Sequence, residues 1–224
     1  LGEDRRIQHA ITLSMCGIES GMKNKKSGSG ILDNDYKAAF DLMVAKWPIM
    51  VLAKKGVGKI MEEWLLSLFN NVYSIVVVNG VMGSLIRLLR YLRQGDLPSM
   101  LLFCYGIDPH LVRLTNRLEG IPLYSMPMQG PVLQGESPLK PLTEKYKVIG
   151  YCDDCKPAIT KMSEFSLVER ETRLFEAASG TMLHRDPTSG KMKLLRLGRW
   201  KGTLQKEDLP LECQYIAISE LLDM

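Results

Sequence analysis

Two predicted hairpins constrain the fold of this chain more than any other feature. The β-branched residues 74–78 run directly into Asn79-Gly80, the strongest short-range signal for a hairpin turn, and residues 81–89 supply the returning strand. A second apolar strand at residues 147–151 leads into Asp153-Asp154, and residues 155–160 follow as its antiparallel partner. The chain is therefore expected to contain antiparallel sheet.

Between and around the hairpins, apolar residues recur at helical spacing. The pattern predicts helices over residues 37–55, 59–70, 97–118 and 163–178. Pro48 is expected to kink or divide the first helix and Pro109 to interrupt the third, whereas Ser163 can cap the fourth and Ser179-Gly180 can end it. Residues 1–31 are interpreted as polar and Gly-rich, with an exposed loop at 23–30, and residues 31–35 as the end of a short strand. Residues 120–146 are expected to form a long connection, and a strand is expected near residues 192–197. This order predicts an α+β fold, with an antiparallel sheet backed by helices.

Composition narrows the class of protein further. With 224 residues, of which 46% are hydrophobic, the chain can bury a core of ordinary size, and one domain is the default. No apolar run reaches the roughly 18 residues of a membrane span, and no signal peptide is recognisable at the start, so no membrane partner and no secretion are expected. Five scattered cysteines fit a reducing compartment, the nucleus or the cytoplasm. The C-x-x-C at residues 152–155 has no second pair at zinc-site spacing. The ends of the chain suggest a piece of a longer protein.

Basic residues gather in clusters although the net charge is only +4. Such clusters can neutralise phosphates, and the alternative interpretation is an ordinary solvated surface. The clustered residues are Lys23, Lys25, Lys26, Lys54, Lys55, Arg87, Arg90, Arg93, Lys191, Lys193, Arg196, Arg199 and Lys201.

Three carboxylates are candidates for a metal site. Asp-Asp is common in turns, but here an apolar strand on either side would hold Asp153 and Asp154 rigidly at a sheet edge. Asp35, at the end of a predicted strand, is placed to be a third ligand. Carboxylate oxygens suit hard divalent cations, and two Mg²⁺ ions about 3.5–4 Å apart can drive phosphoryl transfer.

Four stretches resemble, in family order, the reverse transcriptase domain of non-LTR (LINE-like) retrotransposons. The sequence YCDD (residues 151–154) resembles the Y-x-D-D box, and DYKAAFD (35–41) is similar to the first palm motif, D-F-x-K-A-F-D. RQGDLPSMLLF (93–103) is similar to the second motif, RQGDPLSPLLF, with its Pro one place later. Ser179-Gly180 followed by Lys191 resembles the fourth motif.

This resemblance implies a right-hand polymerase palm that synthesises DNA on an RNA template. Asp35, Asp153 and Asp154 would bind two Mg²⁺ ions, with Mn²⁺ as the substitute ion, and Asp33 is the rival to Asp35. Lys191, with Lys193 as its rival, would lie near the leaving pyrophosphate. The RNA template, the DNA primer and the dNTP would be the partners. The residues implied to contact the nucleotide or template are Phe40, Arg93, Gln94, Gly95 and Tyr151.

The resemblance also implies a division of the chain. Residues 1–30 would be a partial fingers segment, 31–200 the palm with an inserted loop at 120–146, and 201–224 the start of the palm–thumb connection. Two alternatives stay open. One is an inactive retroelement-derived fragment that at most binds nucleic acid, and the other is an unrelated two-metal phosphohydrolase.

Overall fold

The computed structural model describes residues 7–93, 95–124, 141–151 and 153–219, which fall into two compact units. The sheet unit comprises Leu1–Asp35, Arg113–Glu171 and His184–Met224. The helix–hairpin unit comprises Tyr36–Val112 and Thr172–Leu183.

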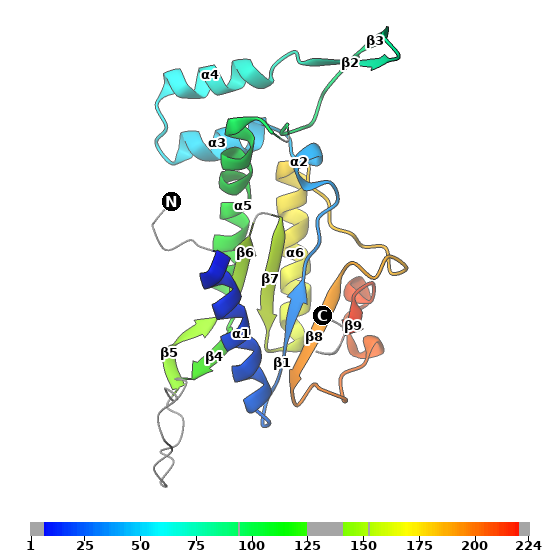
Figure 1. The fold of residues 1–224 in the computed structure, drawn as a ribbon. Coiled ribbons are helices and arrows are strands. Elements are labelled where there is room, and N and C mark those ends of the chain that lie inside the picture. Colours follow the sequence, from blue (N-terminus) through cyan, green and yellow to red (C-terminus); the bar gives the residue numbers. More distant parts are fainter. Residues whose placement is uncertain (1–6, 94, 125–140, 152, 220–224) are drawn as a thin grey trace. The chain divides into compact units, whose positions relative to one another are not determined.

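A five-stranded sheet organises the sheet unit. Its strand order is β6-β7-β1-β8-β9, and all neighbours are antiparallel except β8 and β9. Helix α1 (Ile7–Lys23) lies across one face, and α6 (Met162–Ser179) lies on the other (Figure 1). A separate ribbon pairs β4 (Ile121–Tyr124) with β5 (Pro141–Tyr146). The strands of the sheet are β6 (Val148–Tyr151), β7 (Asp154–Ile159), β1 (Gly28–Asp33), β8 (Lys193–Gly198) and β9 (Ala217–Ser219), and two short 3-10 helices cover Lys206–Asp208 and Leu211–Cys213.

The core of the sheet unit forms where α1 and the β4–β5 ribbon meet the sheet. Tyr146 closes this core, and its hydroxyl donates a 3.0 Å hydrogen bond to the main-chain oxygen of Lys156. Burial of these side chains supplies the main driving force for folding the unit. The buried members are Ile31, Ile121, Leu123, Tyr146, Ala158, Leu195 and Leu197.

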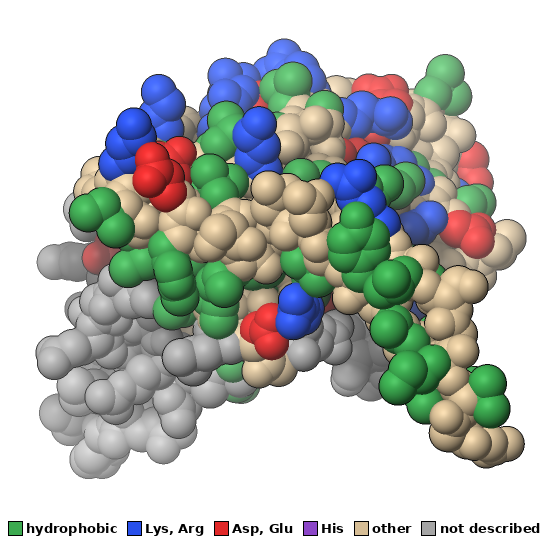
Figure 2. Space-filling view, turned by 90° about the horizontal axis from the view of Figure 1, so that it is seen from above, with side chains coloured by type: hydrophobic (Ala, Val, Ile, Leu, Met, Phe, Trp, Pro, Cys, Tyr) green, Lys and Arg blue, Asp and Glu red, His purple; other side chains and the backbone are tan. Residues whose placement is uncertain are grey.

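The helix–hairpin unit contains α2 (Ala39–Leu42), α3 (Lys46–Lys54), α4 (Lys59–Phe69) and most of α5 (Leu97–Arg117). Met43, Ile49, Leu92 and Phe103 are its most deeply buried large side chains. The β2–β3 hairpin (Tyr73–Val78 and Val81–Arg87) projects from it with hydrophobic side chains exposed along the arm (Figure 2).

Several predictions from local sequence are confirmed. Both hairpins form, and Asn79 and Gly80 adopt the positive φ angles of 50° and 79° that a tight hairpin turn requires. Helix α4 begins at the predicted residue, and Gly180, with φ 79°, ends α6. The mixture of helices with antiparallel and mixed sheets confirms the α+β class. Within the described residues, none of the helices has the length and apolar character needed to cross a membrane.

Other predictions were wrong. Residues 7–23 form a helix rather than an irregular polar segment, and β1 begins at Gly28 inside the predicted loop. The 37–55 helix is divided at residues 43–45, before Pro48, which lies in the first turn of α3 where its missing N–H costs nothing. Helix α5 continues through Pro109.

Two further corrections concern ends of elements. The ends of the 120–146 connection pair as β4 and β5, and its middle lies outside the described residues. At the start of α6 the capping side chain is Glu164, not Ser163. Its carboxylate accepts the main-chain N–H groups of Thr160 and Lys161 at 2.6 and 3.1 Å, which satisfies donors near the helix start.

Candidate functional site

One antiparallel bridge sets the geometry of the candidate site. The main-chain N–H of Asn34 donates to the carbonyl of Cys155 at 3.0 Å, and the two residues form an isolated bridge just beyond β1. This bridge keeps the register of the β1–β7 pair, in which Ile31 pairs with Ala158. Continuing it by one residue sets Asp35 opposite Asp154. Side chains of directly opposed residues share a face, with Cβ atoms about 4.5–5.5 Å apart.

The turn between β6 and β7 carries the other two predicted residues. Tyr151 pairs with Asp154 in the register, so Asp153 lies in the two-residue turn between them. Both aspartates and Tyr151 are exposed at this end of the sheet. Cys152 lies outside the described residues. The structure thus brings Asp153 and Asp154 to the sheet end at which Asp35 also lies.

Asp35 lies close to a lysine and a histidine side chain. Its Oδ2 atom lies 3.6 Å from the Lys191 Nζ and 3.8 Å from the His184 Nε2. The main-chain N–H of His184 donates to the Asp35 carbonyl at 3.0 Å, which ties the segment before β8 to the end of β1. Oδ2 itself is buried and, among the described residues, accepts no hydrogen bond. Lys191, predicted from the fourth motif, is therefore close to Asp35.

Asp33 has different partners from Asp35. The same register sets it opposite Lys156, and the Lys156 Nζ lies 2.5 Å from the Asp33 Oδ1. On the other side, Asp33 pairs in register with Lys193. Lys156 was missed by sequence reasoning, although its position two residues after Asp154 on one strand predicts a shared face. Asp33 therefore lies beside Lys193, and Asp35, two residues further along the chain, lies near Lys191.

The carboxyl group of Asp154 has a raised pKa. Burial raises the pKa of its carboxyl group above the ordinary value of 3.8, and the nearby charges of Asp33, Asp153 and Asp35 raise the pKa further. Lys156 opposes them. The charges of three other carboxylates therefore act on Asp154 at this end of the sheet. Cys155 points to the opposite face, where burial raises the pKa of its thiol to about 12, so it is not a thiolate ligand at neutral pH.

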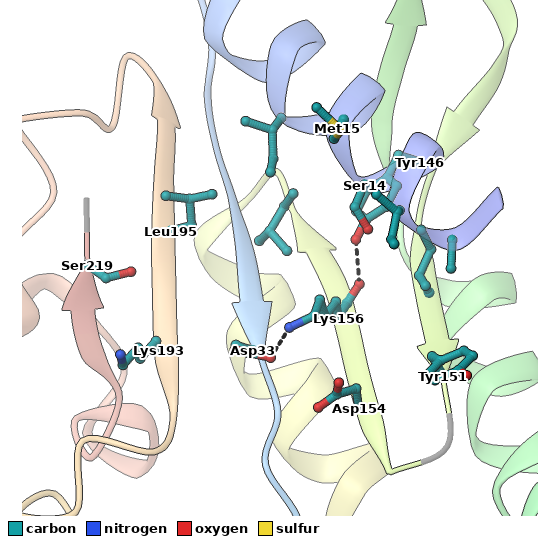
Figure 3. Close-up of a pocket in the computed structure, with 15 residues that line it drawn as sticks. Ser14, Met15, Asp33, Tyr146, Tyr151, Asp154, Lys156, Lys193, Leu195 and Ser219 are labelled. Carbon is teal, nitrogen blue, oxygen red and sulfur yellow. Dashed lines mark hydrogen bonds and ion pairs between the residues drawn. The ribbon is translucent and has the colours of Figure 1, made fainter. Parts of the chain in front are cut away.

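A cavity of about 300 Å³ lies beside these carboxylates, between α1 and the sheet. Figure 3 shows Asp33, Lys156, Asp154 and Tyr151 at one end of it, with Met15 on α1 and Leu195 on β8 along its walls. Lys193 on β8, beside Asp33, and Ser219 on β9 also line it. The cavity gives the carboxylate end of the sheet an apolar border.

The donor chemistry fits divalent cations. Carboxylate oxygens are the ligands that Mg²⁺ and Mn²⁺ prefer, and the buried Asp35 Oδ2 is an acceptor that lacks a hydrogen-bond donor. As they stand, the described His, Cys, Asp and Glu side chains include no group of three gathered closely enough to hold an ion. Asp35, Asp153 and Asp154 are the residues that would hold the ions.

The remaining predicted residues belong to the helix–hairpin unit. Phe40 is half-buried on α2 and stacks on Phe103 with ring centroids 4.5 Å apart. The Arg93 guanidinium lies 5.7 Å from the centroid of the Tyr91 ring, and its Nε is 3.6 Å from the Asp96 Oδ2. Gly95 is exposed with φ 96°, a conformation that favours glycine. Gln94 lies outside the described residues. The roles of these four residues in binding nucleotide or template stay predictions.

In comparisons with known proteins, no family model matches the chain, and no curated protein matches it.

Proposed function

We propose that this chain is the palm of an RNA-directed DNA polymerase, and that Asp35, Asp153 and Asp154 hold two Mg²⁺ ions for nucleotidyl transfer from a dNTP to a primer 3′-hydroxyl. The observation that carries the proposal is the register that sets Asp35 opposite Asp154. The order of the four motifs in the sequence, the α+β class and the closeness of Lys191 to Asp35 add support.

In this proposal the three aspartates position the cations at the end of the sheet. Bound there, the two ions would assist deprotonation of the primer hydroxyl and stabilise the charge on the leaving pyrophosphate. Burial first, and then the charges of neighbouring carboxylates, raise the pKa of Asp154, and a bound cation would relieve the repulsion among these carboxylates.

Lys191 contributes a mobile positive charge. Its side chain is 58% exposed, and its Nζ lies 3.6 Å from the Asp35 Oδ2, so it can turn toward a pyrophosphate held beside Asp35. There it would stabilise developing negative charge or donate a proton. Asp33, paired with Lys156, takes no part in binding the ions.

Metal binding and synthesis test the proposal separately. Titration calorimetry with Mn²⁺ should show binding to the parent chain, strongly weakened binding to Asp153→Asn, and parent-like binding to Glu207→Gln, which removes an exposed carboxylate elsewhere. Primer extension on poly(rA)–oligo(dT) with Mg²⁺ should follow the same ranking. Equal Mn²⁺ binding by parent and Asp153→Asn would contradict the assignment. Metal binding without synthesis would favour the inactive retroelement fragment.

A further inference from the structure

The fold brings together two basic clusters whose nearest members, Lys26 and Arg199, are 173 residues apart in the sequence (199 − 26), at the opposite end of β1 from Asp35. The turn after α1 carries Lys25 and Lys26, and the turn after β8 carries Arg199 and Lys201. Gly28 pairs with Gly198 in the β1–β8 register, and the main-chain N–H of Arg199 donates to the Ser27 carbonyl at 3.2 Å. The four side chains, all exposed, form what we call the four-cation cluster.

Main-chain packing holds the two turns together. Gly198 has φ 58°, and a Cβ placed on it would lie 2.5 Å from the main-chain oxygens of both Asn24 and Ser27. Trp200, between the two cations of the second turn, stacks on Phe165 of α6 with ring centroids 6.1 Å apart. The cluster is therefore presented on a fixed scaffold, and its side chains take no part in building it.

The charges of this cluster are uncompensated. Among the described residues, no carboxylate lies within ion-pair distance of Lys25, Lys26, Arg199 or Lys201, whereas neighbouring Lys23 pairs with Glu19 at 2.6 Å. Four like charges on two joined turns repel one another, and a polyanion relieves that repulsion. Such a surface is suited to a ligand with closely spaced negative charges.

The surroundings favour a nucleic-acid backbone over an acidic protein. Within residues 23–27 and 198–203, all of which the structure describes, no large hydrophobic side chain is exposed. Protein interfaces bury an apolar centre, whereas contacts with phosphate and sugar are mainly charged and polar. Trp200 is half-buried and Met22, just before the first turn, is exposed, but the other residues around the cations are glycine, serine, asparagine and threonine, which offer mainly polar contacts.

We infer that the four-cation cluster binds the phosphate backbone of the RNA–DNA duplex at a place separate from the carboxylates. The identity of the duplex rests on the proposed polymerase function. Eight residues of extended chain from Ser27 to Asp35 separate the two sites by roughly 26 Å. This exceeds the Debye length of about 8 Å at physiological salt, so the two sites act independently and can be tested independently.

Salt-dependent affinity tests the inference. A labelled 20-base-pair RNA–DNA hybrid is titrated with the parent chain, with Lys25→Ala/Lys26→Ala, with Arg199→Ala/Lys201→Ala and with the quadruple variant. Each double variant should reduce the slope of log K against log salt by roughly 2 and weaken Kd roughly tenfold to fiftyfold at 0.15 M salt. The matched control is Lys59→Ala/Lys161→Ala, which removes two exposed lysines that already pair with Glu63 and Glu119, and it should leave the slope unchanged.

The outcomes separate this inference from the proposed function. An unchanged slope in the quadruple variant, with far-UV circular dichroism like that of the parent, would overturn it. So would binding of polyglutamate or of anionic phosphatidylserine vesicles as tight as that of the hybrid. Asp153→Asn should bind the hybrid like the parent. If it does so while neither protein synthesises DNA, the polymerase proposal fails and the backbone contact stands.

Discussion

Asn34 pairs with Cys155 through a main-chain hydrogen bond, from the Asn34 N–H to the Cys155 carbonyl, and this extends the β1–β7 register past the end of β1. Continued by one residue, the register sets Asp35 opposite Asp154, and the charge of Asp35 helps to raise the pKa of Asp154. Two carboxylates are thereby placed side by side at a sheet end, although like charges directly opposed weaken a strand pair. The same register gives Asp33 a lysine, Lys156, as its neighbour. Asp35 and Asp154, whose nearest lysine Nζ (Lys191) is 3.6 Å from Asp35, are a better place for a cation than Asp33, whose carboxylate lies 2.5 Å from the Lys156 Nζ.

Burial of the Asp154 carboxylate, together with repulsion from Asp33, Asp153 and Asp35, predicts that Asp154→Asn makes the metal-free protein more stable at neutral pH. The folded-state pKa of Asp154 is raised above 3.8, so the charged form costs stability that increases as the pH rises from about 4 through the folded pKa. Thermal denaturation in EDTA should give Asp154→Asn a higher Tm than the parent at pH 7 and an equal Tm near pH 3. A lower Tm at pH 7 would contradict the electrostatic account.

Glu171 should have the opposite pH dependence. Burial acts to raise the pKa of this carboxyl, but Arg113, at 2.6 Å, and Arg117, at 2.8 Å, together with Arg170 hold it below 4.5. The stability it contributes is present above pH 4.5 and is lost as the pH falls through the folded pKa. Since the arginines are about half-exposed, Glu171→Gln should cost about 1–2 kcal/mol at pH 7.

Urea denaturation at pH 7 and pH 3 measures this loss, with the exposed Glu207→Gln as control. The difference between parent and Glu171→Gln should shrink at pH 3. A difference of the same size at both pH values would mean that packing, and not charge, explains the effect.

Gly198 and Gly202 flank Arg199 and Lys201 in the turn after β8, and alanine substitutions at the two positions can be compared directly. Both have positive φ, 58° and 76°, but an added Cβ meets main-chain oxygens only at Gly198. Gly202→Ala should cost about 1–2 kcal/mol, the strain of a left-handed residue, and Gly198→Ala about 3 kcal/mol or more. Equal losses in chemical denaturation would show that the two turns are not packed as described.

Lys191 and Lys193 differ in position relative to Asp35, and we expect them to differ in catalysis. Lys191→Ala should lower kcat for single-nucleotide addition roughly tenfold to a hundredfold by removing a charge beside the pyrophosphate. The KM for the dNTP should change less. Lys193 pairs in register with Asp33, so Lys193→Ala is the control. A larger loss in Lys193→Ala would transfer the role to the rival lysine.

Local sequence predicted the hairpins well because β-branched residues and Asn-Gly act over a few positions. Helix α1 was missed for a tertiary reason. Gly17 and Gly21 weaken its helical propensity, yet a Cβ at Gly17 would lie 2.9 Å from the Tyr146 ring and one at Gly21 2.7 Å from Leu197. These glycines let the helix approach the sheet closely, and that requirement appears only once Tyr146 and Leu197 are in place.

In the candidate site, too, some residues could be predicted from local sequence and others depend on contacts between distant segments. The first palm motif that the sequence resembles begins at Asp35 and not at Asp33, and the β1–β7 register gives the two aspartates different neighbours. Lys156, His184 and the four-cation cluster depend on strand pairing between distant segments, so no local pattern identified their roles. The identities of the metal ligands stay predictions.

Single-nucleotide incorporation by Asp35→Asn and Asp33→Asn, measured beside the parent on an RNA template with a DNA primer and Mg²⁺, tests the central claim most directly. We predict that Asp35→Asn loses incorporation to background, while Asp33→Asn, which removes the partner of Lys156, retains most of it. Incorporation by Asp35→Asn at the parental rate, or its loss only in Asp33→Asn, would contradict a metal site formed by Asp35 with Asp153 and Asp154.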